Sequence, residues 1–286
     1  MIAAALAAIS IGTVSVRAVA FRQWSSAVEV NNDAIRLVYV PQIGRIMYFG
    51  RIHGPNVLWV NSGVNPGESW VNWGGDKLWP APQSRWNWPP DKDIDGSRWS
   101  VELNRDGFTT TSPVSVKDGI RFRRTVRMSP AGRGVEITNT LQKLAGEPLE
   151  LSIWQIAQVD NPEWASLPYQ VRPEVPNGYA AYDRQDFADN TIVASDRVIF
   201  HRHRSKSIKF GSAGNTGRLQ AKVGESIFNM QADYREGERY PDNGRAQQIY
   251  LSADPLAYAE LELVSPLRTY ARGDESSFTV RWQISN

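Results

Sequence analysis

Lys117-Asp-Gly-Ile-Arg-Phe-Arg-Arg-Thr-Val-Arg-Met128 contains the clearest structural signal of the sequence. Asp118-Gly119 between two alternating runs is typical of the turn of a β-hairpin. From Ile120 to Met128, apolar side chains alternate with Arg and Thr, as expected for a strand with one buried face. Arg124 interrupts the alternation because it falls on the apolar side. A buried arginine needs a carboxylate or a ligand as its partner, so we expect a position at the edge of the sheet as the simpler explanation.

The rest of the chain consists of short β runs separated by turns. Runs at 34–40 and 44–50 are expected to pair around Pro41-Gln-Ile-Gly44, and 56–60 is expected to form a third strand. Residues 160–189 are rich in Pro, Asn, Gly and Asp and predict a long loop. Together the runs predict about fifteen strands in one all-β domain, residues 21–286, folded as a large antiparallel β-sandwich.

A tryptophan-rich stretch interrupts this β pattern. Five of the eleven tryptophans lie between positions 70 and 88, and the segment reads Trp70-Val-Asn-Trp-Gly-Gly-Asp-Lys-Leu-Trp-Pro-Ala-Pro-Gln83. Its prolines exclude a regular helix, so we expect a long structured loop. Its indoles are expected either to hold a flat sugar ring or to plug the core, and different indoles can do either.

Composition excludes several classes of protein. The formal net charge is +2, with acids and bases nearly balanced, so a nucleic-acid partner is not expected. The chain has no cysteine, which excludes disulfides and thiolate chemistry, and its three histidines are His53, His201 and His203. No phosphate loop, dinucleotide fingerprint or serine-hydrolase motif occurs.

Residues 1–20 form a candidate signal peptide. Residues 1–16 are apolar and uncharged, and Ala18-Val-Ala20 has the small-x-small form of a cleavage site. The run is too short for a convincing transmembrane helix. We therefore expect a periplasmic or secreted protein without a membrane span in the mature chain; the alternative is a first strand, with a cytoplasmic location.

Three further motifs resemble the galactose mutarotase-like superfamily, the β-supersandwich of the aldose epimerases. Val40-Pro-Gln-Ile-Gly-Arg-Ile46 is similar to its early strand-turn, and Glu136-Ile-Thr-Asn-Thr-Leu141 to the turn before its central strand. Glu260-Leu-Glu262 and the following turn resemble its closing strand pair. The W-G-G-D-K-x-W-P-x-P-Q segment resembles an uncharacterised bacterial branch of this group.

The resemblance implies a sugar bound in a concave cleft of the sheet under the Trp-rich loop. Mutarotases use a histidine acid and a glutamate base, and Glu262 is the counterpart of the base. The central strand carries Trp154 and Gln158 but no histidine, so Asp76 or His53 would have to supply the acid. The remaining substrate-binding candidates are Arg45, Trp73, Lys77, Trp79 and Gln83. Alternatively, Glu260 and Glu262 are two solvated strand glutamates.

Two functional hypotheses follow, both with a sugar or oligosaccharide as partner. The first is an aldose 1-epimerase-like isomerase or related carbohydrate-active enzyme; the second is a non-catalytic glycan-binding module, which the missing histidine favours. A third is a purely structural β domain.

No cofactor or metal is expected. Asp91, Asp93 and Asp95 match the spacing of a calcium loop, but Pro89-Pro90 forbids the helix that normally enters such a loop. These aspartates are therefore expected to cap a turn; the alternative is a calcium loop without helices.

Overall fold

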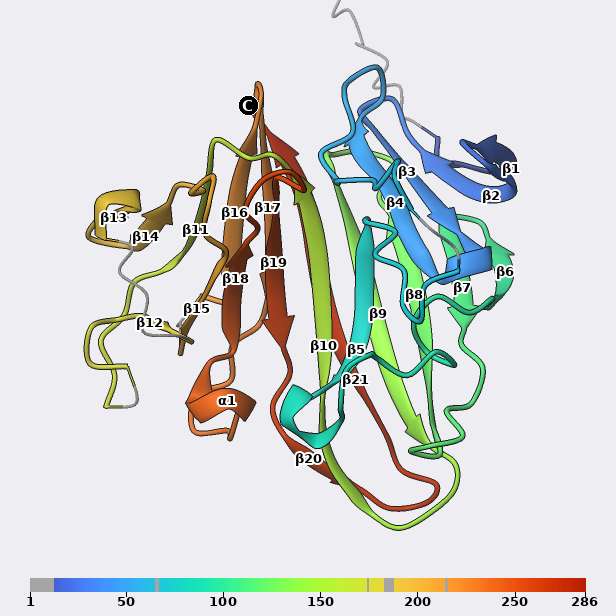
Figure 1. Ribbon diagram of the computed structural model, residues 1–286. Coiled ribbons are helices and arrows are strands. Elements are labelled where there is room, and N and C mark those ends of the chain that lie inside the picture. Colours follow the sequence, from blue (N-terminus) through green and yellow to red (C-terminus); the bar gives the residue numbers. More distant parts are fainter. Residues whose placement is uncertain (1–12, 65–66, 174, 183–187, 214–215) are drawn as a thin grey trace, which may run out of the picture.

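The computed structural model describes residues 13–64, 67–173, 175–182, 188–213 and 216–286. Within these ranges the chain is almost entirely antiparallel strand, arranged in three sheets (Figure 1). The four-stranded sheet has the order β1 (Ser15–Phe21), β2 (Trp24–Asn31), β3 (Ile35–Val40) and β4 (Arg45–Arg51). The prediction of an all-β antiparallel sandwich is confirmed.

The other two sheets are larger. The seven-stranded sheet contains, in order, β12 (Ala180–Ala181), β15 (Ile208–Ser212), β18 (Gln247–Leu251), β19 (Tyr258–Val264), β10 (Leu149–Asp160) and β20 (Arg268–Tyr270), with β5 (Asp76–Ala81) also paired to β10. The ten-stranded sheet has the order β13 (Thr191–Val193), β14 (Arg197–Phe200), β11 (Trp164–Pro168), β16 (Arg218–Val223), β17 (Ser226–Ala232), β21 (Glu275–Ser285), β9 (Gly134–Lys143), β8 (Ile120–Met128), β7 (Gly107–Thr111) and β6 (Ser100–Asn104). The helices described are short: η1 (Pro41–Ile43), η2 (Gln83–Arg85), η3 (Ala188–Asn190) and α1 (Pro241–Gly244).

One hydrophobic core joins the three sheets. The ten-stranded sheet has one apolar face, as the alternating burial of β8 shows, and both other sheets pack on it. Phe49 of the four-stranded sheet lies 5.5 Å from Trp282 of the ten-stranded sheet between ring centroids. Leu78 and Ile153 of the seven-stranded sheet belong to the same core. The opposite face of the ten-stranded sheet is therefore polar and faces solvent.

Arg124 does not lie at a sheet edge, so the edge explanation is wrong. Its strand, β8, is paired with β7 on one side and β9 on the other. The guanidinium is 0% exposed and points into the core, where Nη1 lies 2.7 Å from Asp76 Oδ2. A carboxylate from another sheet is thus the partner that a buried arginine requires.

Three segments differ from the expected pattern. Asp76–Ala81, expected to be loop, forms strand β5, which pairs with the middle of β10. β5 has β10 as its strand partner and lies at the edge of its sheet, where the missing N–H of Pro80 is tolerated. Residues 56–60 contribute isolated bridges instead of a strand. The expected loop 160–189 contains β11 and β12.

Gly74-Gly75 leads the chain into β5 and requires glycine at both positions. Gly74 has φ +87° and Gly75 has φ +70°. A Cβ at Gly75 would lie 2.4 Å from the carbonyl oxygen of Ile46, and one at Gly74 would lie 2.3 Å from that of Trp59. Close backbone approach therefore fixes the start of β5.

The candidate signal peptide lies partly outside the described residues, which begin at Thr13. Ala18 and Val19 lie in β1, where they pair with Val28 and Ala27 of β2. Cleavage after Ala20 would remove most of this strand; export stays a prediction. Among the described residues, no helix has the length and apolar character needed to cross a membrane.

Candidate functional site

Strands β5, β10 and β19 place half of the predicted site residues on one face, and β18 extends this face. Directly paired residues share a face of a sheet, and faces alternate along each strand. Trp79 pairs with Trp154, and Gln158 pairs with Glu260. Lys77, Ile156, Glu262 and Gln248 form one continuous row across the four strands. All of these side chains lie on the face turned away from the ten-stranded sheet, which we call the outer face.

Glu262 is at the centre of this face and is 0% exposed. Its Oε2 accepts hydrogen bonds from Trp154 Nε1 at 2.9 Å and from Lys209 Nζ at 2.8 Å. Burial raises the pKa of Glu262, while the neighbouring Lys209 ammonium lowers it in part. The interpretation of solvated strand glutamates therefore does not apply to Glu262.

A second ion pair lies beside the first. Lys77 Nζ is 2.6 Å from Glu260 Oε1, which also accepts a hydrogen bond of 3.0 Å from Gln158 Nε2. Lys77 is also positioned 4.4 Å from the ring centroid of Trp79, within the range of a cation–π contact. Two cation–carboxylate pairs thus lie side by side on the outer face, and each cation also lies over an indole ring, Lys77 over Trp79 and Lys209 over Trp154.

Trp79 is surrounded by other indoles. Its ring centroid lies 5.5 Å from that of Trp154, 5.6 Å from Trp86, 6.2 Å from Trp88 and 6.4 Å from Trp70, all in edge-on arrangements. Trp79 is only 4% exposed, whereas Trp88 is 55% exposed. Part of the Trp-rich stretch therefore acts as a plug over the sheet, and Trp88 presents its ring to solvent.

The side of the site nearest to solvent is formed by residues that the sequence did not single out. Lys209 lies 4.6 Å from the ring centroid of Trp154 and 5.1 Å from that of Tyr182, and Arg245 lies 4.3 Å from the Tyr182 ring. Tyr182 is 38% exposed, and burial of its hydroxyl raises its pKa. The position of Lys209 fits the alternation of side chains expected for strand β15. Nothing in the sequence, however, indicates that β15 reaches Glu262.

Asp76 is not brought to the outer face. It lies on the core side of β5, 0% exposed, where Oδ1 accepts a 2.7 Å hydrogen bond from the Ile46 amide. Burial raises its pKa, and Arg124 lowers it. Asp76 therefore forms part of the contact between the sheets and does not lie beside Glu262, where it was expected as the acid.

The other predicted residues also lie apart from Glu262. His53 is exposed in the turn after β4. Arg45 is buried and pairs with Asp95 at 2.6 Å, Trp73 packs edge-on against Trp24 at 5.7 Å, and Gln83 is exposed in η2. The structure thus brings together Glu262, Trp154, Trp79, Lys77 and Gln158 of the predicted set.

The surroundings of Glu262 are tightly packed among the described residues, and the expected sugar-sized hollow between the Trp-rich stretch and Glu262 stays a prediction. Five of the hollows formed by described residues do not have Glu262 in their lining. The one beside Trp79 and Trp86 has a volume of only about 10 Å³. Lys209 and Trp154 occupy the space next to the carboxylate, so the site is a filled polar cluster.

Several buried polar atoms of the outer face nevertheless lack a hydrogen-bond partner among the described residues. They are Glu262 Oε1, Trp79 Nε1, Gln158 Oε1 and Gln248 Oε1. An unsatisfied buried polar group costs about 1–3 kcal/mol. Donors and acceptors on one face are therefore left for water or for a ligand.

The three aspartates with calcium-loop spacing have protein partners. Asp91 Oδ2 accepts a hydrogen bond from Ser115, Asp93 Oδ2 accepts one from the Val116 amide, and Asp95 pairs with Arg45. In the part of the chain that the structure describes, no group of three or more His, Cys, Asp or Glu residues could hold a metal ion.

Comparisons with known proteins address the fold. No protein-family model and no curated protein sequence matches the chain. Among solved structures, a protein of Synechocystis sp. PCC 6803 superposes with a TM-score of 0.61 at 13% identity, covering 91% of this chain and 95% of that one. A galactose mutarotase-like protein of Lactobacillus casei ATCC 334 gives 0.60 at 8% identity, covering 91% and 100%. A putative aldose 1-epimerase of Escherichia coli K12 gives 0.51 at 11% identity, covering 95% and 99%.

These likenesses extend over nearly the whole of each chain, and at such low identities they bear on architecture alone. The chain therefore has the galactose mutarotase-like fold.

Proposed function

We propose that the outer face around Glu262 binds a sugar or oligosaccharide. The observation that carries this proposal is the group of unpartnered polar atoms on one face, next to the rings of Trp79 and Trp154. Sugar hydroxyls donate and accept hydrogen bonds, and sugar rings pack on indoles, so a sugar matches both features. The fold neighbours described as a putative aldose 1-epimerase and a galactose mutarotase-like protein support the same class of ligand.

Binding in this proposal requires a local rearrangement. Lys209 and Tyr182 are the partly exposed members of the cluster, with Lys209 21% exposed at its side chain. A ligand that displaces them reaches Glu262 Oε1 and the Trp154 ring. Binding therefore uses flexible side chains at the rim and leaves the sheet unchanged.

One observation favours a second, catalytic function. Burial raises the pKa of Glu262, and a base with a raised pKa is suited to proton transfer near neutral pH. In an epimerase, Glu262 would take the proton of the anomeric hydroxyl while Lys209 donates one to the ring oxygen. The bond between C1 and the ring oxygen breaks, giving an open-chain aldehyde, and reclosure on the other face returns both protons.

The two functions are separated by one set of measurements. Anomerically pure sugars are followed by NMR for exchange, and tryptophan fluorescence reports binding. Saturable binding without accelerated exchange identifies a glycan-binding module; accelerated exchange that is abolished in Glu262→Gln identifies an epimerase. Glu136→Gln, on the exposed face of the ten-stranded sheet, is the matched control.

Sugar binding at this face is refuted if no sugar changes the fluorescence or if Lys209→Met and Glu262→Gln leave a measured affinity unaltered. Loss of binding in the Glu136→Gln control would also exclude the outer face as the site.

A further inference from the structure

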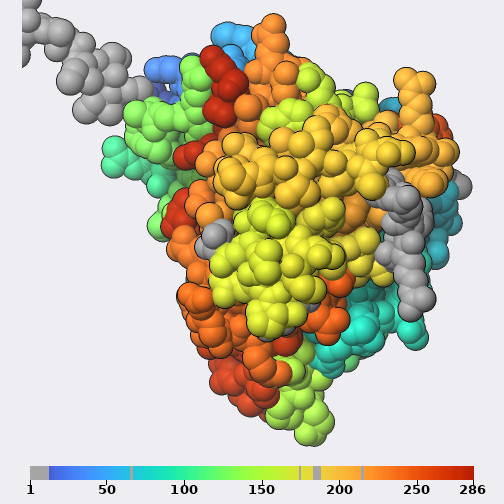
Figure 2. Space-filling view, turned by 90° about the vertical axis from the view of Figure 1, so that its left-hand side faces the viewer, coloured from blue at the N-terminus to red at the C-terminus, as the bar shows by residue number. Residues whose placement is uncertain are grey.

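A hollow lies on the opposite layer of the molecule, on the polar face of the ten-stranded sheet. It has a volume of about 370 Å³, within the range of small-ligand pockets. Strands β11, β14, β16 and β17 supply most of its walls. Figure 2 shows the molecule from the left-hand side of Figure 1. The segment from β11 to β14, coloured yellow-green to yellow, spreads over this side. The hollow shares no residue with the Glu262 site.

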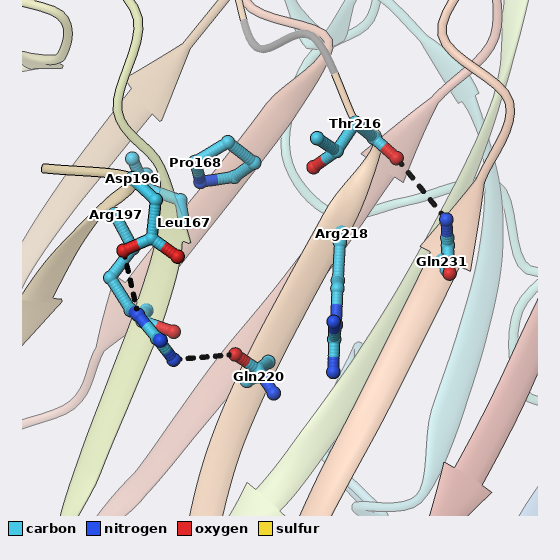
Figure 3. Close-up of a pocket in the computed structure, with 9 residues that line it drawn as sticks. Leu167, Pro168, Asp196, Arg197, Thr216, Arg218, Gln220 and Gln231 are labelled. Atoms are coloured by element: carbon cyan, nitrogen blue, oxygen red, sulfur yellow. Dashed lines mark hydrogen bonds and ion pairs between the residues drawn. The ribbon is translucent and has the colours of Figure 1, made fainter.

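Most of the residues that line this hollow have polar side chains. The lining contains Arg197, Arg218, Gln220 and Gln231, with Leu167 and Pro168 as its apolar members and no aromatic ring. Figure 3 shows the Arg218 side chain lying between Gln220 and Gln231. A ligand that fits must therefore be held by hydrogen bonds and charge and not by stacking.

A chain of hydrogen bonds fixes these side chains in place. Arg197 Nη1 donates to Gln220 Oε1 at 3.1 Å, and Gln220 Nε2 donates to Asn229 Oδ1 at 2.7 Å. Arg218 Nη2 donates to the same Asn229 oxygen at 2.9 Å. Both guanidiniums are thus oriented before a ligand arrives, which reduces the entropy lost on binding.

The charges of the hollow select a single negative charge. Arg197 is paired with Asp196, with Nε and Oδ1 3.2 Å apart. Arg218 is hydrogen-bonded to a neutral amide, and no carboxylate of the described residues forms an ion pair with it. One cation therefore remains uncompensated. A monoanionic carboxylate matches it, while Asp196 would repel the second charge of a phosphate.

We propose that this hollow is a second ligand site, for the carboxylate of an acidic sugar. Arg218 binds the carboxylate, and the amides of Gln220 and Gln231 bind neighbouring hydroxyl groups. The protein thereby holds an acidic glycan on the face opposite to the Glu262 site.

The test is a titration of the full-length protein with D-glucuronate, D-glucose, acetate and D-glucose 6-phosphate, followed by saturation-transfer NMR and calorimetry. We expect glucuronate to bind and Arg218→Met to weaken it about tenfold or more, the effect of losing a charged hydrogen bond. Arg127→Met is the matched control, because Arg127 is also exposed on the polar face of this sheet. Lys209→Met, which alters the Glu262 site, leaves glucuronate affinity unchanged.

Each other outcome overturns the assignment. Glucose or acetate binding that Arg218→Met weakens as much as it weakens glucuronate binding removes the requirement for both carboxylate and hydroxyls. Tighter Arg218-dependent binding of the phosphate ester excludes carboxylate selection. Loss of affinity in Arg127→Met or Lys209→Met relocates the ligand to another site. No saturation transfer at about 10 mM glucuronate excludes the site at any useful affinity.

Discussion

The ion pair between Asp76 and Arg124 predicts a large, pH-dependent loss of stability when its arginine is removed. The pair joins β5 of the seven-stranded sheet to β8 of the ten-stranded sheet, and both side chains are 0% exposed. Arg124 Nε also donates to Asn139 Oδ1 at 2.8 Å. Arg124→Met therefore leaves a buried carboxylate without its cation.

The magnitude follows from this geometry. Removing one partner of a buried ion pair typically costs about 3–5 kcal/mol, equivalent to a melting temperature lower by about 6–10 °C in a domain of this size. Burial raises the pKa of Asp76 and Arg124 lowers it, so the variant raises it further. Above the raised pKa the unpaired carboxylate is charged and the full cost is present. As pH falls through that pKa, protonation relieves the cost.

The assay is urea unfolding at pH 5 and pH 8, followed by tryptophan fluorescence and far-UV circular dichroism. Asp76→Asn, the double variant and the exposed neighbour control Arg123→Met complete the set, and the control is expected within about 0.5 kcal/mol of wild type. The double variant is expected to be destabilised by less than the sum of the two single variants. Additive losses, or a cost of Arg124→Met that is larger at pH 5 than at pH 8, would refute the reasoning. If Arg124→Met does not fold, Arg124→Lys tests the same pair with the charge retained.

Three further predictions concern the outer face and its approach. Burial raises the pKa of Glu262, so the stability linked to this group is present below its unfolded pKa and is lost as pH rises through the folded value. Glu262→Gln should therefore flatten the dependence of the unfolding free energy on pH between pH 5 and 8, and an unaltered slope in urea titrations would contradict this. Trp79→Ala should lower the free energy of unfolding by about 3–5 kcal/mol, because the ring of Trp79 is only 4% exposed. Trp88→Ala, at 55% exposure, should lower it by less than about 1 kcal/mol. Thermal melts in which Trp88→Ala is the less stable variant would disprove the plug. Gly75→Ala should lower the free energy of unfolding by about 1–3 kcal/mol, because its Cβ would lie 2.4 Å from a backbone carbonyl oxygen at a position where φ is +70°. Gly63→Ala should be nearly neutral, because its Cβ would lie 3.6 Å from the nearest atom.

The sandwich was predictable because many of its strands carry a polar face. β8 alternates buried and exposed residues over nine positions, and the turn at Asp118-Gly119 sets its start. The same alternation showed that Arg124 points inward. Its partner was not predictable, because Asp76 lies 48 residues away in another sheet and no local pattern connects the two positions.

Strand β5 was missed because it has no alternation to detect. All six residues from Asp76 to Ala81 are buried, one side covered by the core and the other by indoles. A sequence in which charged, aromatic and proline residues are equally buried reads as a loop, since period-2 polarity is the main strand signal. Pairing with β10, which is buried on both faces over most of its length, is what makes the segment a strand.

This one error also explains which of the predicted site residues lie together. A loop allows Asp76 and Lys77 to face the same ligand, but neighbouring residues of a strand point to opposite faces. Once 76–81 is a strand, only one of the two can lie beside Glu262, and pairing with β10 gives that position to Lys77. Asp76 must then face the core, where only a cation such as Arg124 makes its burial acceptable. A variant at Asp76 therefore acts on the outer face through the position of β5, and its effect on sugar binding should follow its effect on stability. Binding lost in a variant that retains wild-type stability would show that the carboxylate itself meets the ligand.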